Sequence, residues 1–227
     1  MPLQLIIGNK NYSSWSLRPW LAMKVAGIPF TETLISLDTP DFRAKISELS
    51  GGDGAGSVPV LIDGEIRVWE TVAILEYLAE KFPQAGLWPA QTMARAHARA
   101  IAAEMHSGFR ALRRHLPMNV RRPARQRPYD AAVAADVARI DSLWCECRRR
   151  FGSGGAFLYG GFGAADAMYA PVVWRFHTYA VDVSAAARDY MSAVLGLPAT
   201  VAWCEAARGE PWVLAHDEVD WPDELRE

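Results

Sequence analysis

Two neighbouring serines, Ser13 and Ser14, stand directly before an apolar segment with the composition of a helix. A serine at a helix start most often caps the helix, because its hydroxyl accepts a hydrogen bond from a backbone N–H of the first turn. Neither serine is expected to be a nucleophile, since the five histidines form no convincing His–Asp arrangement with them and none lies near a GxSxG motif. The hydroxyl would instead donate a hydrogen bond to a bound, negatively charged group.

A second candidate site is the pair Val58–Pro59, which opens an apolar run expected to be a strand. An X-Pro bond can be cis, which turns the chain sharply and can leave the backbone N–H and C=O of Val58 facing a ligand. Those two groups can pair with a peptide as an added strand would. The alternative is an ordinary trans proline at the edge of a sheet.

The third candidate is the pair Glu70–Thr71 at the start of a predicted helix. The threonine hydroxyl and the nearby N–H groups can hold a carboxylate, while the carboxylate of Glu70 can accept from an ammonium group. The alternative is that Glu70 merely complements the helix dipole and Thr71 merely caps the helix.

Alternating short strands and helices are expected to position these motifs. Apolar runs bounded by Gly, Pro and Asn predict strands, and apolar residues spaced three or four apart predict helices. The order is β-α-β-α-β-β-α. The predicted elements are a strand at 3–7, a helix at 14–26, a strand at 29–36, a helix at 40–49, hairpin strands at 58–62 and 65–68 that turn at Asp63–Gly64, and a helix at 71–82.

The rest of the chain is expected to be all helix. Gly86 and Pro89 mark a linker, after which the sequence is rich in Ala and Arg. We therefore divide the chain into an α/β domain at 1–83, a linker at 84–91 and an all-α domain at 92–227. The helices of the last domain are predicted at 96–116, 130–151, 164–179, 184–195 and 198–207.

Composition narrows the class of protein. The chain has 227 residues, 51% of them hydrophobic and 22% charged, which is typical of a globular protein and excludes a disulfide-stapled miniprotein. The three cysteines form no CxxC pair, so free thiols are expected, with neither a disulfide framework nor a metal site. No apolar run reaches about 18 residues and the first residues do not resemble a leader peptide, which predicts a cytoplasmic protein without a membrane partner.

Charge is distributed unevenly, although the net charge is only −2. Residues 95–150 carry 13 basic and 5 acidic side chains, whereas residues 151–227 carry 4 and 11. Nucleic-acid binding is not expected, because interleaved aromatic residues and a recognised binding motif are missing. Solvated helix faces, an anion pocket and pairing with the acidic tail remain as explanations for a cluster of Arg110, Arg113, Arg114, Arg121, Arg122, Arg125 and Arg127.

Several motifs occur in the order found in one known family. The β-α-β-α-β-β-α unit followed by helices, with Val58–Leu61 opening the hairpin and Glu70–Thr71 opening the next helix, resembles the glutathione transferase family. The segment 13–18, SSWSLR, resembles the serine-type signature of its zeta and tau classes, and GGFGAAD at 160–166, with Pro171, resembles the capping motif before its buried core helix. The resemblance covers nearly the whole chain. It implies a zeta- or tau-like bacterial member with a thioredoxin-like domain, a mixed four-stranded sheet and an all-α C-terminal domain.

The resemblance implies glutathione as co-substrate and no metal. Ser13 would donate to the glutathione sulfur, with Ser14 as a second donor. The backbone of Val58, with its neighbours Ser57 and Pro59 also at the glutathione site, would bind the cysteinyl part. The γ-glutamyl group would be held by Glu70 and Thr71.

Four positions depart from the family pattern. Trp15 stands where zeta-class isomerases have cysteine, and Ser57 replaces the usual Lys or Gln before Val–Pro. The loop at 50–56 is unusually rich in glycine, which leaves Arg43 or Lys45 as candidates to hold the glycyl carboxylate. Gly163 replaces the usual Ser or Thr cap.

The electrophile pocket is expected between the two domains. Its predicted lining comprises Trp15, Met105, His106, Phe109 and Arg113, with Trp174 and the tail around Trp212 and Trp221 as further candidates.

These features predict a homodimeric glutathione transferase that activates the thiolate for addition to, or substitution on, a small electrophile. One alternative is a binding or scaffold protein of the same fold with little turnover. Another is a glutathione-dependent isomerase of an unsaturated diacid, which additionally needs cationic groups to hold its substrate.

Overall fold

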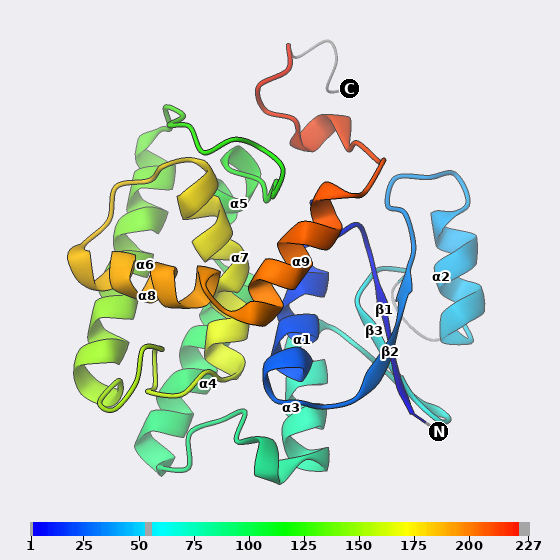
Figure 1. Cartoon of the computed structure of the whole chain (residues 1–227), viewed down its shortest axis with the longest axis horizontal. Coiled ribbons are helices and arrows are strands. Elements are labelled where there is room, and N and C mark those ends of the chain that lie inside the picture. The colour runs from blue at the N-terminus through cyan, green and yellow to red at the C-terminus, as the bar shows by residue number, and fades with distance from the viewer. Residues whose placement is uncertain (1, 53–55, 223–227) are drawn as a thin grey trace.

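A mixed four-stranded sheet forms the first part of the molecule (Figure 1). The computed structural model describes residues 2–52 and 56–222, so residues 53–55 of the predicted glycine-rich loop lie outside the described residues. The strands lie in the order β2-β1-β3-β4; β1 pairs parallel with β2 and antiparallel with β3, and β3 pairs antiparallel with β4. Their bounds are β1 Leu3–Ile7, β2 Phe30–Leu34, β3 Val60–Asp63 and β4 Ile66–Trp69. The predicted mixed sheet and its element order are confirmed.

Helices cover both faces of this sheet. Leu3, Leu5 and Ile7 of β1 belong to the large core, whereas Ile6 packs in a small cluster with Ile46. This alternation follows from the two-residue period of a strand. Figure 1 accordingly shows α2 on one side of the sheet and α1 and α3 on the other. These helices are α1 Ser14–Val25, α2 Phe42–Ser50 and α3 Thr71–Lys81.

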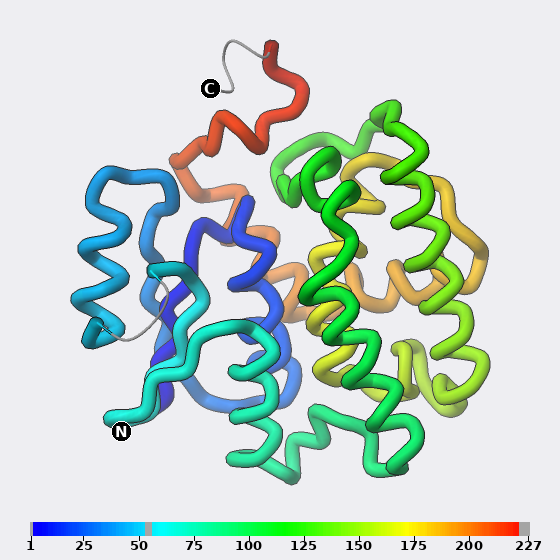
Figure 2. The backbone as a smooth tube through the Cα atoms, turned by 180° about the vertical axis from the view of Figure 1, so that it is seen from behind, coloured from blue at the N-terminus to red at the C-terminus, as the bar shows by residue number. Residues whose placement is uncertain are grey.

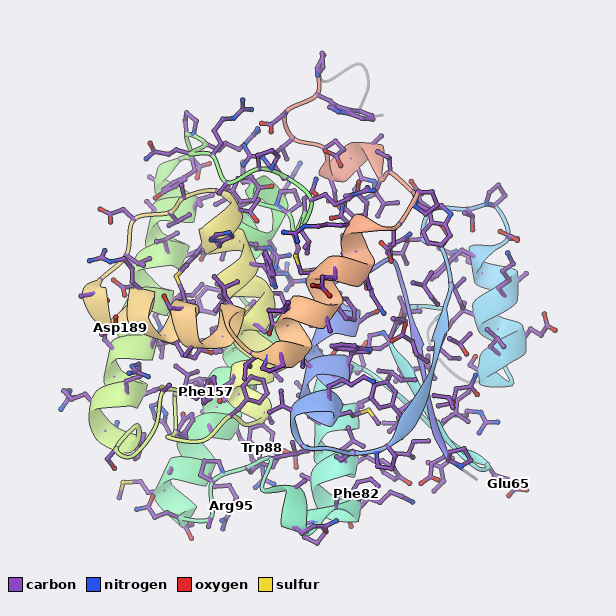
Figure 3. All side chains as sticks on the ribbon, viewed as in Figure 1. Glu65, Phe82, Trp88, Arg95, Phe157 and Asp189 are labelled. Atoms are coloured by element: carbon purple, nitrogen blue, oxygen red, sulfur yellow. The ribbon has the colours of Figure 1, made fainter. Side chains whose placement is uncertain are left out.

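The second part of the chain is helical, as predicted, and gathers on one side of the sheet (Figure 2). Figure 3 shows Glu65 at the hairpin turn and Asp189 on α8 toward opposite ends of the molecule, with Trp88 between them. Among the residues that the structure describes, no helix is long and apolar enough to cross a membrane. The elements are η1 Pro83–Ala85, α4 Thr92–Ser107, α5 Arg110–His115, α6 Ala131–Phe151, α7 Ala164–Thr178, α8 Ala185–Leu195, α9 Pro198–Arg208 and η2 Ala215–Asp217.

One predicted helix is interrupted. Residues 96–116 were expected to be a single helix, but Gly108 is extended and Phe109 has a positive φ of 55°, which ends α4 and starts α5. A positive φ is incompatible with a continuing right-handed helix. The break gives Arg110 and Arg113 a short helix of their own.

Helix α7 is the centre of the helical part. Every residue in it except His177 is buried. It packs against α1, and the guanidinium of Arg18, itself fully buried, donates from Nε to the carbonyl of Met168 at 2.9 Å. The sheet half and the helical half therefore share one continuous core.

The start of α7 depends on Asp166. Its two carboxylate oxygens accept from the N–H of Leu158 at 3.0 Å and of Gly163 at 2.9 Å. The second bond satisfies the N-cap residue in the manner of a capping box, in which the acid at the third helical position reaches back. Gly163 has no side chain to return the bond, so Asp166 alone makes this cap.

We predict that Asp166→Asn lowers the free energy of unfolding by about 2 kcal/mol, because an amide has one acceptor oxygen and leaves a buried N–H unpaired. Urea unfolding at about pH 8 measures this with the carboxylate ionised, since burial raises the pKa of Asp166 to about 6. The control is Asp182→Asn, whose side chain is 98% exposed and which should change stability by less than about 0.5 kcal/mol. Equal stability of the two variants would contradict this role.

Candidate active site

Most of the predicted binding residues meet in one cavity of about 250 Å³, here called the Val58 cavity. The Val58–Pro59 peptide bond is cis. The cavity brings the start of α1 and residues of α3 and α4 to the segment that leads into β3. Its lining consists of Trp15, Ser57, Val58, Pro59, Glu70, Thr71 and His106.

Glu70 presents its carboxylate to this cavity. As N-cap of α3 it has a φ of 66°, yet its side chain makes no capping hydrogen bond to the helix. Its Oε2 lies 3.6 Å from Nε2 of His106, and its side chain is 55% exposed. His106 Nδ1 is buried and lacks a hydrogen-bond partner within the described residues. The carboxylate is thus available to a ligand with a positive group.

Thr71 joins α3 to α1. Its hydroxyl donates to the carbonyl of Trp15 at 3.3 Å, and the residue is buried. The side chain therefore fixes the distance between the two helix starts that border the cavity. The backbone N–H groups at the start of α3 carry the positive end of the helix dipole, which favours an anion there.

Ser13 and Ser14 occupy different places. Ser13 is buried and is the N-cap of α1: its Oγ accepts from the N–H of Ser16 at 3.4 Å and donates to Ser16 Oγ at 2.7 Å. Ser16 Oγ in turn accepts from the N–H of Gly8 at 3.0 Å, which ties the helix start to the end of β1. Ser14 is partly exposed and lines a second cavity.

Cationic side chains surround Trp15. The guanidinium carbon of Arg18 lies 4.0 Å from the centroid of its ring and that of Arg113 lies 4.8 Å away. The ring of His106 meets it edge-on at 5.3 Å. Cation–π attraction holds the indole in this position.

Arginine dominates the second cavity, here called the arginine cavity, which has a volume of about 430 Å³. It borders the Val58 cavity, because Trp15 lines both. Burial and the charge of Arg110 lower the pKa of Arg113. The lining is Tyr12, Ser14, Trp15, Arg110, Arg113, Arg114, Pro117, Met118, Arg175 and Asp217.

Five predicted site residues line neither cavity: Ser13, which is buried as the cap of α1, and Arg43, Lys45, Met105 and Phe109. The further pocket candidates Trp174, Trp212 and Trp221 also line neither. Met105 has no exposed surface and Phe109 is 7% exposed, so both are part of the core that α4 and α5 bury. Arg43 and Lys45 lie on the exposed side of α2, where Lys45 pairs with Asp41 at 2.5 Å. Neither cation is brought to the Val58 cavity in the described part of the chain.

Two residues near the site were not assigned a role from the sequence. Arg18 and Arg175 are both buried, and Arg175 lines the arginine cavity from α7. The signal in the sequence was an arginine within an otherwise apolar helical segment. Because arginine is almost never fully buried without a partner, such a residue indicates a buried polar contact or a site. No group of three or more His, Cys, Asp or Glu side chains able to hold a metal occurs within residues 2–52 and 56–222.

The family models match both parts of the chain. Residues 12–81 match the model described as glutathione S-transferase, N-terminal domain, and residues 130–206 match that of the glutathione S-transferase C-terminal domain. Among solved structures, a glutathione transferase homolog from Burkholderia with bound glutathione is 21% identical with a TM-score of 0.67, covering 92% of this chain and 100% of that one. A diazinon-metabolizing glutathione S-transferase of the silkworm Bombyx mori is 16% identical with a TM-score of 0.69, over 91% and 98%. These two likenesses show the fold.

Curated relatives are matched over shorter stretches. Dichloromethane dehalogenase of Methylorubrum extorquens is 41% identical over 66 residues, which is 27% of this chain and 21% of the relative. A probable maleylacetoacetate isomerase of Caenorhabditis elegans is 34% identical over 100 residues, 44% of each chain. The matched part thus spans less than half the length of either relative.

We predict that Ser13→Ala lowers the free energy of unfolding by about 1–2 kcal/mol, because it removes the α1 cap and the buried hydrogen bond to Ser16. Ser14→Ala, which removes a partly exposed hydroxyl, is the matched control and should change it by less than about 0.5 kcal/mol. Thermal or urea unfolding of both variants measures the difference. A larger loss of unfolding free energy in Ser14→Ala than in Ser13→Ala would show that the Ser13 hydroxyl does not stabilise the start of α1.

Proposed function

The chain belongs to the glutathione S-transferase family, and from this premise we propose that it is a glutathione-dependent transferase acting on a small electrophile. One observation carries the proposal: the Val58–Pro59 segment, the start of α3 and the start of α1 border one cavity. That cavity offers a peptide edge, a carboxylate and a helix N-terminus, which match the peptide, the ammonium and the carboxylate of glutathione.

The γ-glutamyl group is the part of glutathione that this cavity suits best, since it carries both an ammonium and a carboxylate. In the proposal, Glu70 accepts from the ammonium, as its side chain is not used to cap α3. The carboxylate lies at the start of α3, where Thr71 and the helix dipole favour negative charge. The N–H and C=O of Val58 pair with the cysteinyl backbone as an added strand would.

Ser13 is proposed to donate to the sulfur, with Ser14 as second donor. Ser13 Oγ already accepts from the N–H of Ser16, so only its hydrogen must turn from Ser16 Oγ toward the ligand. That hydrogen bond and the start of α1 both favour thiolate over thiol. A pKa about 2 units lower, which corresponds to about 2.7 kcal/mol, makes the thiolate dominant near neutral pH.

The thiolate then attacks the electrophile. In a substitution, the C–S bond forms as the leaving group departs with its bonding electrons, and the thiol proton has already passed to solvent. In an addition, the electrons of the attacked multiple bond take up a proton instead. In the proposal this chain's residues bind and orient glutathione and stabilise its sulfur, while the sulfur makes the new bond.

An isomerase alternative draws on the arginine cavity. Isomerisation of an unsaturated diacid by addition and elimination of glutathione needs the same thiolate and cationic groups to hold the substrate. The match to a probable maleylacetoacetate isomerase and the four arginines that line the arginine cavity favour it. Trp15 at the position of the zeta-class cysteine speaks against that particular reaction.

A binding protein with little turnover is the second alternative. The observation in its favour is that the Ser13 hydroxyl is fully engaged within α1, with its hydrogen donated to Ser16. Such a protein would keep the peptide-binding edge and lose activation of the sulfur.

A homodimer is part of the proposal. Two large apolar side chains of the edge strand β4 are exposed, Ile66 by 48% and Trp69 by 40%. Exposed apolar side chains at an unpaired sheet edge favour a contact with a second chain.

Retention on immobilised glutathione together with turnover of a chlorinated nitrobenzene tests the proposed function. We expect Ser13→Ala to lower turnover about tenfold or more at neutral pH and to change retention little, since a charge-assisted hydrogen bond to sulfur is lost. The half-maximal rate should move to higher pH, because the thiol pKa rises. Retention without turnover on a broad panel of electrophiles would favour the binding protein, and a large effect of Ser14→Ala alone would assign the sulfur to Ser14.

Glu70→Gln and Thr71→Ala are expected to weaken glutathione binding about tenfold. The first removes the negative charge that faces the ammonium, and the second removes the hydroxyl that, in the proposal, turns from the carbonyl of Trp15 to the γ-glutamyl carboxylate. The midpoint of thermal unfolding should fall by no more than a few degrees. The control is Glu76→Gln on the same helix, which breaks only a surface pair with Arg99 and should bind normally. Isothermal titration measures the affinity, and unchanged values for both site variants would make this helix start purely structural.

A further inference from the structure

The arginine cavity carries positive charge that the protein does not neutralise. Four of its lining residues are arginines, Arg110, Arg113, Arg114 and Arg175, and one is an acid, Asp217. Within the described residues, no ion pair at 4.0 Å or less includes any of these four arginines. An excess of charge in a recess bordered by apolar side chains attracts a counter-charge.

Neighbouring arginines on the same chain segment show the contrast. Arg122 and Arg125 both pair with Asp220 of the tail at 2.9 Å. Arg121 donates to the carbonyls of Glu210 and Trp212, and Arg127 donates to that of Val219. The acidic tail thus satisfies the arginines at 121–127 and leaves those at 110–114 facing the cavity.

Two buried guanidinium groups, those of Arg175 and Arg18, add to the positive potential of the arginine cavity. Arg175 is 4% exposed; its Nε donates to the carbonyl of Leu116 at 2.9 Å and its Nη1 to that of Pro171 at 3.4 Å, so it is held by neutral groups. Arg18 is fully buried behind the ring of Trp15, and its Nη1 has no partner within the described residues. Burial and the neighbouring charge of Arg113 lower the pKa of Arg175 to about 10.

Asp217 opposes this charge only in part. It reaches the cavity from η2 in the tail, and burial raises its pKa. One carboxylate against four guanidinium groups leaves the cavity cationic. Ordinary electrophiles without charge gain nothing from such a lining, whereas a carboxylate can take bidentate hydrogen bonds from arginine.

We propose that the arginine cavity binds the electrophile and selects substrates that bear a carboxylate. This proposal rests on the proposed glutathione-dependent activity. Trp15 and Ser14 at the start of α1 line the cavity, so a substrate held there lies beside the proposed sulfur position. Arg110 and Arg113, three positions apart on α5, would hold the carboxylate and present the carbon that reacts.

The test compares a chloronitrobenzoate with the matching chloronitrobenzamide. In both, the sulfur forms a bond to the ring carbon and chloride leaves with the electron pair, so the two substrates differ in charge. We expect Arg110→Gln with Arg113→Gln to lower kcat/KM for the benzoate about tenfold or more and for the benzamide less than about twofold. Added salt should slow the benzoate reaction of the wild type and have little effect on that of the double variant.

Arg149→Gln is the matched control, since Arg149 is exposed near the carboxyl end of α6 and outside both cavities. It should leave both reactions at wild-type rates. Equal loss of benzoate and benzamide turnover in the double variant, or no loss of either, overturns the proposal.

Direct binding separates this proposal from the proposed function. If the wild type turns over neither compound, the transferase activity on such electrophiles fails, and calorimetry with each compound alone decides about the cavity. Tighter binding of the benzoate than of the benzamide by the wild type, lost in the double variant, supports the anion site without the reaction. Equal binding of the two compounds overturns it.

Discussion

The packing of α1 against α7 is the contact on which the rest of the structure depends. Helix α1 belongs to the sheet half and α7 is the buried centre of the helical half, and the Arg18 guanidinium crosses between them to the carbonyl of Met168. A fully buried cation tolerates little movement, because its hydrogen bonds cannot be replaced by water. The start of α1, with Ser13, Ser14 and Trp15, is therefore held where both cavities open, and the geometry of each cavity follows from this one helix contact.

The distribution of charge follows from which arginines the tail can reach. The segment at 95–150 is strongly basic and the end of the chain is acidic, so pairing of the two was one of three explanations from the sequence. The structure divides the cluster, since Arg122 and Arg125 meet Asp220 while Arg110 and Arg113 do not meet an acid within 4.0 Å in the described part of the chain. The break at Phe109 accounts for the division, because it ends α4 and starts α5, whose Arg113 lies over the ring of Trp15 and whose Arg110 lines the same cavity.

The spacing of apolar residues along the sequence was enough to predict most of the helices and strands. The features that it missed depend on contacts between elements that are distant in the sequence. Strand β1 follows from a short run of apolar residues and α3 from the helical spacing of its apolar residues, patterns that act within a few positions of one another. The sequence prediction missed the break between α4 and α5 although glycine commonly ends a helix, because the apolar spacing continues past Gly108 and the positive φ of Phe109 accompanies its burial in the core. The same burial removes Met105 and Phe109 from the predicted pocket, and the role of Arg175 depends on α7 lying beside α5, which a linear pattern does not contain.

Contact with Trp15 explains how the guanidinium groups of Arg18 and Arg113 can lie close to each other. The ring of Trp15 contacts both the buried Arg18 and the partly exposed Arg113, with the two guanidinium groups 4.0 and 4.8 Å from its centroid. The negative faces of an indole attract both cations, which would otherwise repel each other in a low-dielectric setting. Trp15 borders both cavities, so the size of this one side chain shapes the wall between the Val58 cavity and the arginine cavity.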